Sequence, residues 1–428
     1  MLPEIYSMWK HLKEKGIKLP KITAEQINAQ IEPVLREMEK VGVKIDVKSL
    51  NDLSKKLESE LSLLQKSIFD LCDGEFNLNS PNQLAEILFE KLKIPSSDLK
   101  KTKSGISTAA SELRKIEDKH PVITKIIRYR EIQKLISTYL TPLPLLVDKD
   151  FRLHTTYGQD TQTSRLTSSE PNLQNIPIKG EIGPQIRQSF IAKDGCSLVS
   201  ADYSQIELRI VAVLADDRNM LASFKNGEDI HAHTASEIFK KNKKDITKDE
   251  RRFAKVINFG ILYGMSPYGL SQALGIGQSA AAEYIFRYMD SYKGIKNYAI
   301  DIIEKAKKLG YVETLFGFRR YLQNINERSS YLSDSDERIA INTPVQGTAA
   351  ELIKLAMIKL SKELKKLQKQ KNIARLILTV HDELVVECSD SIAKQVASLV
   401  KKTMENVVTF PIKIEVEVGI GKNWSESK

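Results

Sequence analysis

Two apolar segments that lie far apart in the chain each lead to an acidic residue. The run Ser197–Ala201 ends at Asp202, and the run Leu376–Val380 ends one residue before Asp382 and Glu383. Short apolar runs bounded by turn or charged residues predict buried strands. The chain must therefore form a sheet that accepts strands from distant parts of the sequence, with acidic residues at strand ends.

The segments around these strands indicate how the sheet is embedded. Further strands are predicted at 384–388 and 412–418, whereas apolar residues recur at helical spacing through most of 204–365. Helices are also predicted over 22–71, broken by a short turn and extended piece at 41–46. The pattern indicates an α+β fold in which one sheet carries large helical insertions.

The two aspartates have ordinary and functional interpretations. Asp202 precedes a predicted helix and could simply cap it, and Asp382 with Glu383 could form a solvated hairpin turn. However, adjacent carboxylates inside apolar flanks are costly unless a positive group offsets them. Placed side by side, the two strand ends would form a site for two Mg²⁺ ions, with Mn²⁺ able to substitute, suited to phosphoryl transfer.

Composition sets limits on the class of protein. The 428 residues have 41% hydrophobic content and a net charge of +10, which favours phosphate-rich partners but also fits a solvated basic surface. No apolar run reaches the roughly 20 residues of a membrane span, and no signal peptide is evident. Three widely spaced cysteines predict neither disulfides nor a zinc site. The cysteine usage predicts a reducing compartment.

A third segment predicts a helix with a substrate-facing stripe. Thr247 and Glu250 have the spacing of a capping box. A single face then carries cations and aromatic residues at intervals of four: Arg251, Lys255, Phe259 and Tyr263. Cations suit the phosphates of a nucleoside triphosphate, and aromatic rings suit its sugar and base. An amphipathic helix with a basic face is the alternative interpretation.

The other positions of this helix support the same assignment. Phe253, Ile257 and Ile261 are expected to pack into the core. Gly260 costs roughly 1 kcal/mol against Ala inside a helix, which suggests a close approach by a substrate or another chain segment. Gly264 can end the helix.

In this order, the three segments are similar to motifs A, B and C of the family A DNA polymerases. The chain resembles the Klenow-like polymerase portion of bacterial DNA polymerase I over about residues 22–426. The likeness includes the segments 163–177, 311–317 and 342–350 and the ending 415–424. The resemblance implies a right-hand fold with an antiparallel palm sheet and mostly helical fingers and thumb. It also implies DNA-directed addition of deoxynucleotides to a primer 3′ end, with release of pyrophosphate. It implies a cytoplasmic, nucleoid-associated monomer, with a viral or organellar origin left open.

The resemblance also implies residue roles. The metal ligands would be Asp202, Asp382 and the carbonyl of Tyr203, with Glu383 in a supporting catalytic role and Lys255 as general acid. The nucleotide would contact Arg251, Lys255, Phe259, Tyr263, His231, Gln205, Ile206 and Glu207, the last as a steric gate against a 2′-hydroxyl. Primer–template DNA would contact Arg165, Asn172, Gln174, Arg338, Asn342, Gln346, His381, Lys101, Lys103, Ser107 and Lys134. Without the resemblance, His231 would be interpreted as a histidine that packs between helices, and the loop 100–105 as a solvated basic loop.

The family pattern also implies a division into domains. We expect a palm-associated N-terminal segment at 1–42, a thumb at 43–140, a first palm part at 141–205, fingers at 206–340 and a second palm part at 341–428. Few residues precede the polymerase portion, so we expect neither a 3′–5′ exonuclease nor a 5′ nuclease domain in this chain.

One departure and several alternatives remain. Ser164 stands where the family usually has Gly, at a backbone position that could use a positive φ, so the geometry around Arg165 is open.

Paired carboxylates and a basic surface also fit a two-metal nuclease, and basic character alone fits a non-catalytic DNA-binding scaffold. Because Glu207 would read the sugar of the incoming nucleotide, an RNA template is a narrower alternative.

Overall fold

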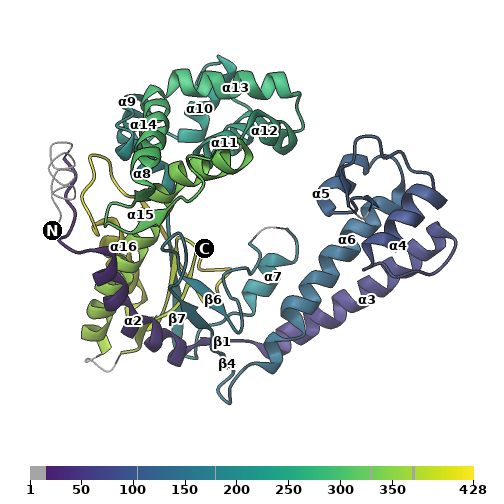
Figure 1. The fold of residues 1–428 in the computed structure, drawn as a ribbon. Coiled ribbons are helices and arrows are strands. Elements are labelled where there is room, and N and C mark those ends of the chain that lie inside the picture. Colours follow the sequence, from purple (N-terminus) through teal and green to yellow (C-terminus); the bar gives the residue numbers. More distant parts are fainter. Residues whose placement is uncertain (1–15, 104, 179, 328–329, 369–371) are drawn as a thin grey trace. The chain divides into compact units, whose positions relative to one another are not determined.

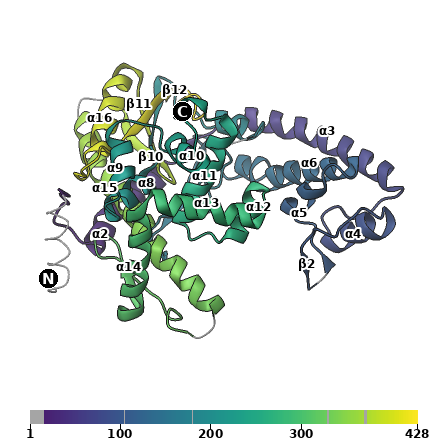
Figure 2. The ribbon, with the colours of Figure 1, turned by 90° about the horizontal axis from the view of Figure 1, so that it is seen from above.

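The computed structural model of the chain describes residues 16–428 except 104, 179, 328–329 and 369–371. The chain divides into two compact units (Figures 1 and 2). The first takes in the segment ending at Gly42 together with Thr155–Asn175 and Ala192–Lys428, and the second takes in Val43–His154 and Ile176–Ile191. The predicted domain limits inside each unit stay predictions.

The first unit contains the main sheet. Its four strands have the order β10-β11-β7-β12 and are all antiparallel: β7 (Cys196–Tyr203), β10 (Ala374–Val380), β11 (Glu383–Ser389) and β12 (Val416–Gly421). Strands from both sides of the helical insertion therefore pair in one sheet, as predicted. Two-stranded ladders join β5 (Thr156–Gly158) to β6 (Thr167–Ser169) and β8 (Tyr311–Glu313) to β9 (Arg319–Tyr321).

Helices cover this sheet and form a second cluster beside it (Figure 1). Helices α15 and α2 pack on β10, and α16 packs on β7 and β12, while α10 packs on α11 and α12 on α13. The helices of the unit are α2 (Ala24–Val41), α8 (Ile206–Leu214), α9 (Arg218–Lys225), α10 (Ile230–Phe239), α11 (Lys248–Leu262), α12 (Pro267–Leu274), α13 (Gln278–Ser291), α14 (Lys293–Leu309), α15 (Ser330–Gln368) and α16 (Ala393–Glu405), with 3₁₀ turns at Lys243–Asp245 and Asp390–Ile392.

The second unit is built on two helices, α3 (Val47–Cys72) and α6 (Pro121–Leu135), which pack on each other. Its remaining elements are β1 (Val43–Lys44), α4 (Pro81–Ala85), β2 (Lys101–Thr102), β3 (Gly105–Ile106), α5 (Ala110–Leu113), β4 (Arg152–Leu153) and α7 (Gly183–Gln188), with π-helical turns at Glu86–Lys91 and Ile136–Leu140 and 3₁₀ turns at Arg114–Ile116 and Leu143–Leu145. Apolar side chains of α3, α6 and the segment 84–116 form its core.

Two sequence predictions about strands were incomplete. The predicted strand at 412–418 begins only at Val416, because its partner β7 ends at Tyr203, which pairs with Val416. Ile412 and Ile414 are buried but have no strand to pair with. The hairpin β8–β9 was missed inside the predicted helical region, since its strands have only three residues each.

Within the described ranges, no helix is long and apolar enough to cross a membrane. The three cysteines (Cys72, Cys196 and Cys388) are buried and carry free thiols.

Candidate active site

The hairpin turn between β10 and β11 brings Asp382 next to the end of β7. The backbone N–H of Tyr203 donates to the carbonyl of Asp382 at 3.2 Å, and Glu383 lies opposite Asp202 in the β7–β11 ladder. His381 turns the chain with φ of +52°. Asp202, predicted just past a strand end, is itself paired within β7. The structure thus brings together the two aspartates that the sequence separates.

This sheet edge holds more negative than positive charge. The pKa of Asp382 is raised to about 7, first by burial and then by the neighbouring carboxylates of Glu207 and Asp202, while the Arg165 guanidinium opposes the shift. Three carboxyl groups, those of Asp202, Glu207 and Asp382, and the Arg165 guanidinium thus influence one another electrostatically. Crowded carboxylates of this kind are stabilised by a cation that binds between them.

The donor set fits a hard divalent cation that is shared with a substrate. No group of three His, Cys, Asp or Glu side chains in the described part of the chain is arranged to hold a metal by itself. Mg²⁺ commonly uses one or two carboxylates together with substrate phosphates and water. Asp202, Asp382 and the Tyr203 carbonyl match that requirement because all three donors are oxygen atoms, whereas zinc sites mostly use Cys and His ligands.

Glu383, although adjacent to Asp382, is in a different environment. It is 2% exposed, and one of its carboxylate oxygens accepts hydrogen bonds from the Ser200 hydroxyl and, at 2.7 Å, from Trp424 Nε1. The other oxygen lies 3.1 Å from Lys428 Nζ. Its charge is offset within the protein. These three partners could not be predicted from the sequence, because they come from β7 and from the segment after β12.

Glu207, at the start of α8, is held from two sides. Arg165 donates to its Oε1 at 2.5 Å, and the Tyr263 hydroxyl donates to its Oε2 at 2.5 Å. Glu207 is 4% exposed, and burial together with this carboxylate raises the pKa of Tyr263 above its usual range. The structure thus links three residues to which the family resemblance assigns separate contacts: Arg165 with DNA, Glu207 with the sugar and Tyr263 with the templating base. Next to Glu207, Ile206 is buried and Gln205 begins α8 with φ of +52°.

Helix α11 has the predicted start and the predicted stripe. The Thr247 hydroxyl accepts from the Glu250 N–H at 3.2 Å, and the Glu250 carboxylate accepts from the Thr247 N–H at 2.9 Å, which completes the capping box. Arg251 and Lys255 are exposed, and Phe259 and Tyr263 are half-buried with ring centroids 6.3 Å apart. The stripe thus presents cations at one end and aromatic rings at the other.

The remaining face of α11 matches the prediction only in part. Ile257 and Ile261 are buried, but Phe253 is half-buried, and the Arg252 guanidinium lies 5.4 Å from its ring centroid. The expected core position of Phe253 is therefore wrong, because it lies in the first turns of the helix, where the core no longer covers this face. A Cβ at Gly260 would lie 3.0 Å from the Met265 sulfur, so the close approach at this position comes from the chain itself.

Two contacts link α11 to the start of α10. Arg251 Nε donates to the Asp229 carboxylate at 2.6 Å, and that carboxylate also caps α10. His231 is 2% exposed and lies with its Nδ1 3.0 Å from Asn258 Nδ2. Burial, the largest cause, lowers the His231 pKa to about 4. The ring is therefore neutral near pH 7, as in a packed helix histidine.

The residues expected to contact DNA fall into both units. On α15, Arg338, Asn342 and Gln346 follow one another at intervals of four and share one face. Asn342 Oδ1 is buried and accepts no hydrogen bond from any residue that the structure describes. A Cβ at Gly264, which has φ of +67°, would lie 2.4 Å from Arg338 Cγ, so only glycine fits where α11 ends beside this face.

The other predicted DNA contacts are more exposed. Asn172 caps its own turn by accepting from the Gln174 N–H at 3.0 Å. In the second unit, Lys101, Lys103 and Lys134 are exposed and Ser107 is half-buried, around the β2–β3 hairpin and on α6. Ser104, in the predicted basic loop, lies outside the described residues.

Comparison with known proteins places these features in a family. The family model described as DNA polymerase family A matches residues 47–426. The chain is 44% identical over 406 residues to the thermostable DNA polymerase I of Thermus thermophilus, covering 94% of this chain and 48% of that protein. It is 44% identical over 407 residues to DNA polymerase I of Bacillus caldotenax, covering 94% of this chain and 46% of that protein. The chain thus spans about half the length of these relatives.

A solved structure shows the same fold. The structure described as the "POL domain of Pol1 from M. smegmatis complex with DNA primer-template and dNTP" aligns with a TM-score of 0.89 and 36% identity, covering 94% of this chain and 70% of that chain. The chain belongs to DNA polymerase family A. The predicted fold class, an α+β right-hand polymerase with an antiparallel sheet, is confirmed.

Proposed function

We propose that this chain is a template-directed DNA polymerase that adds deoxynucleotides to a primer 3′ end. The observation that carries the proposal is the meeting of Asp202 and Asp382 at one edge of the sheet, where burial first and the carboxylates of Glu207 and Asp202 second raise the pKa of Asp382 to about 7. The exposed cations Arg251 and Lys255 on α11 supply the complementary feature, since they suit a triphosphate.

The carboxylates of Asp202 and Asp382 and the carbonyl of Tyr203 would hold two Mg²⁺ ions, for which Mn²⁺ can substitute. When bound, such ions lower the pKa of an attacking hydroxyl and offset charge on the phosphates. The chain's residues position the other groups. Glu383, held by three donors, supports this edge as a fixed neighbour.

Helix α11 would bind the nucleotide. Arg251 exchanges its Asp229 contact for a phosphate, and Lys255 holds the β- and γ-phosphates and donates a proton to the leaving group. The primer 3′-hydroxyl loses its proton to water, a bond forms between the 3′-oxygen and the α-phosphorus, and the bond to the bridging oxygen breaks, so that pyrophosphate leaves with the proton from Lys255. His231 stays a proposed phosphate neighbour.

The sugar and base would lie over the aromatic end of α11. Phe259 packs on the sugar, and Tyr263 lies near the templating base. Glu207 occupies the space of a 2′-hydroxyl, because Arg165 and Tyr263 hold both of its oxygens. Gln205 and Ile206 line the adjacent backbone. Asp202, Glu207 and α11 thus enclose one nucleotide from three elements.

Primer–template DNA would follow the face of α15 and the basic residues. The unpartnered acceptor of Asn342 supports a contact there, because a buried acceptor without a donor is costly. Arg165, Asn172, Gln174, Arg338, Gln346 and His381 complete this set, and Lys101, Lys103, Ser107 and Lys134 would contact the DNA backbone from the second unit. The description of the mycobacterial structure, which names primer-template and dNTP, supports both partners. Monomeric state and a cytoplasmic location stay predictions.

Primer extension tests the proposal. A labelled DNA primer on a DNA template is incubated with Mg²⁺, with and without the four deoxynucleotides, beside a primer with a mismatched 3′ end. The proposal expects extension of the paired primer and no shortening of the mismatched one. Shortening without nucleotides would favour the nuclease alternative, and binding of primed DNA without turnover would favour the scaffold. A second reaction, with an RNA template in place of the DNA template, tests whether the sugar of the template strand affects extension.

A further inference from the structure

Helix α15 carries two buried charged residues that the proposed chemistry does not use. Glu351 and Lys354 are both 0% exposed, in an otherwise apolar part of the helix. With Gly347 they lie at i, i+4 and i+7, and so face one side. A Cβ at Gly347 would lie 2.4 Å from Thr314 Cγ2 and 3.6 Å from the Thr163 carbonyl oxygen, so this face lies against the 163–165 loop.

The Lys354 ammonium group is directed at that loop and at α2. Its Nζ donates to Asn28 Oδ1 at 2.8 Å and lies 3.5 Å from Ser164 Oγ. Glu351, whose Oε1 accepts from the Thr314 hydroxyl at 2.7 Å, lies near enough to raise the pKa of Lys354, while burial, the larger cause, lowers it. Burying an ammonium group is costly unless it is paired and hydrogen-bonded. Among the described residues, Asn28 and Ser164 supply the hydrogen bonds of Lys354, and Glu351 favours its charged form.

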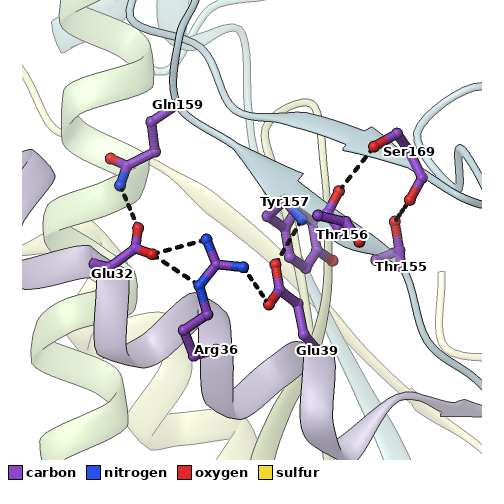
Figure 3. A network of polar contacts seen from close by, with 8 residues as sticks. All are labelled: Glu32, Arg36, Glu39, Thr155, Thr156, Tyr157, Gln159 and Ser169. Carbon is purple, nitrogen blue, oxygen red and sulfur yellow. Dashed lines mark hydrogen bonds and ion pairs between the residues drawn. The ribbon is translucent and has the colours of Figure 1, made fainter.

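Helix α2 holds the strand that leads into the same loop (Figure 3). Gln159 Nε2 donates to the Glu32 carboxylate at 2.8 Å and to the Asn28 carbonyl at 3.2 Å, and Glu39 accepts from the Tyr157 N–H at 2.7 Å. Arg36 lies between Glu32 and Glu39 and contacts both, at 2.7 and 2.6 Å. The segment 157–164 is therefore fixed to α2 at one end and to Lys354 at the other.

The loop ends at the residue that holds Glu207. Ser164 is 1% exposed and has φ of +57°, a conformation that glycine adopts more readily. The serine supplies a hydroxyl for Lys354 that glycine lacks. The next residue, Arg165, accepts from the Thr161 hydroxyl at 2.8 Å through its carbonyl and donates to Glu207 at 2.5 Å.

We propose that Lys354 is a positioning residue for nucleotide selection, acting through Asn28 and Ser164 on the loop that carries Arg165, and through Arg165 on Glu207. The inference rests on the proposed function, because it gives Glu207 the role of excluding a 2′-hydroxyl. Lys354 itself does not touch the nucleotide. Loss of its contacts frees the loop, loosens the Arg165–Glu207 pair and admits ribonucleotides more readily.

The test compares variants along this path with a matched control. Lys354→Met removes the ammonium group, Asn28→Ala removes its acceptor, and Ser164→Ala removes the hydroxyl while keeping a Cβ. Lys359→Met is the control, since Lys359 is half-buried on the same helix and donates to the Val407 carbonyl at 3.0 Å instead. The kcat and KM for one deoxynucleotide and its ribonucleotide are measured by single-nucleotide primer extension, with the thermal midpoint of each variant.

The expected result is a change in selectivity. Lys354→Met should lower the deoxy-to-ribo ratio of kcat/KM by about tenfold, the usual scale for losing a buried hydrogen-bonded charge contact, and Asn28→Ala and Ser164→Ala by a smaller factor. Lys354→Arg, which keeps charge and donors, should restore part of the ratio. Lys359→Met should leave it unchanged even where its thermal midpoint falls.

Three results decide between the proposals. A wild-type chain that does not extend primers overturns the proposed function itself. A wild-type chain that extends, with the same selectivity ratio in all four variants, overturns the positioning role while leaving the polymerase intact. Should Lys354→Met fail to fold, Asn28→Ala and Ser164→Ala carry the test, and an unchanged ratio in both also overturns it.

Discussion

Two regions of the first unit bury charge, and they do so in different ways. On α15, Lys354 is hydrogen-bonded to Asn28 and Ser164, and Glu351 accepts from Thr314, so that groups of the protein hold both side chains. At the sheet edge, Asp382 shares its surroundings with Asp202 and Glu207, and the Arg165 guanidinium offsets only part of the charge.

The difference distinguishes charged residues that support the fold from charged residues that can take part in a reaction. Charged residues that are held by groups of the protein keep elements in place and need no outside partner, whereas crowded carboxylates are stabilised by a cation that binds between them. The same contrast holds between neighbouring residues, since Glu383 has three donors and Asp382 faces two carboxylates. Function is expected where the charge remains unbalanced.

The largest expected effect comes from the unbalanced edge. Asp202→Asn should lower the rate of primer extension by at least about a thousandfold, since metal-assisted charge stabilisation is worth several kcal/mol. DNA affinity, measured by fluorescence anisotropy, should stay close to wild type because the phosphate contacts lie elsewhere. Extension at the wild-type rate would remove Asp202 from the reaction.

A smaller loss is expected on α11. Lys255→Met should lower kcat by about a hundredfold, the low end for loss of a general acid. The matched control is Arg252→Met on the same helix, because Arg252 is exposed and pairs only weakly with Asp249 at 3.4 Å. Rapid-quench kinetics of single-nucleotide addition measures both. Equal losses in the two variants would mean that the stripe has no special role.

The buried residues of α15 should respond to pH rather than to metal. Burial raises the pKa of Glu351 to about 8, so the folded state binds a proton that the unfolded state releases between about pH 4.5 and 8. Wild-type stability is lost as pH rises through this window. The gain from Glu351→Gln over wild type should therefore increase from pH 5 to pH 8, by on the order of a few kcal/mol at about 1.4 kcal/mol per pKa unit.

Thermal denaturation of both proteins across this pH range measures the effect. Glu363→Gln is the control, since Glu363 is on the same helix and pairs with Lys366 in solvent. A Glu351→Gln gain that stays constant from pH 5 to pH 8 would contradict the buried, protonated state of Glu351.

Exposed charge in the second unit should matter least per residue. Lys101→Gln should weaken DNA binding slightly and reduce the slope of log affinity against log salt by about 0.9, the contribution of one phosphate contact. Lys101 lies on the exposed strand β2, so its charge remains in contact with solvent. A salt titration of DNA binding measures this slope, and an unchanged slope would place the hairpin away from the DNA.

The sequence predicted those strands and helix ends that are determined by residues close together in the chain. The apolar runs before Asp202 and Asp382 gave the two strands, and Thr247 with Glu250 gave the start of α11. Contacts made across the fold could not be read in this way. Lys354 meets Asn28 and Ser164 only after α15 packs on α2, and Glu383 meets Trp424 only after β12 pairs with β7.

One such contact had a partial signal in the sequence. Glu351 and Lys354 interrupt an apolar stretch of α15, and charged residues in such a stretch indicate either a surface face or a buried pair. Ser164 was noted as a departure at a glycine-like position, and the structure gives it φ of +57° beside Lys354. The sequence alone did not connect the two.

The most direct test of the account compares Asp382 with its neighbour. Single-turnover primer extension is measured against Mg²⁺ concentration for the wild type, Asp382→Asn and Glu383→Gln. The account predicts that Asp382→Asn abolishes extension at every Mg²⁺ concentration, while Glu383→Gln keeps the wild-type Mg²⁺ dependence with a rate within about tenfold, since its carboxylate loses only one ion pair. Extension by Asp382→Asn, or equal loss in both variants, would contradict the distinction between unbalanced and balanced charge.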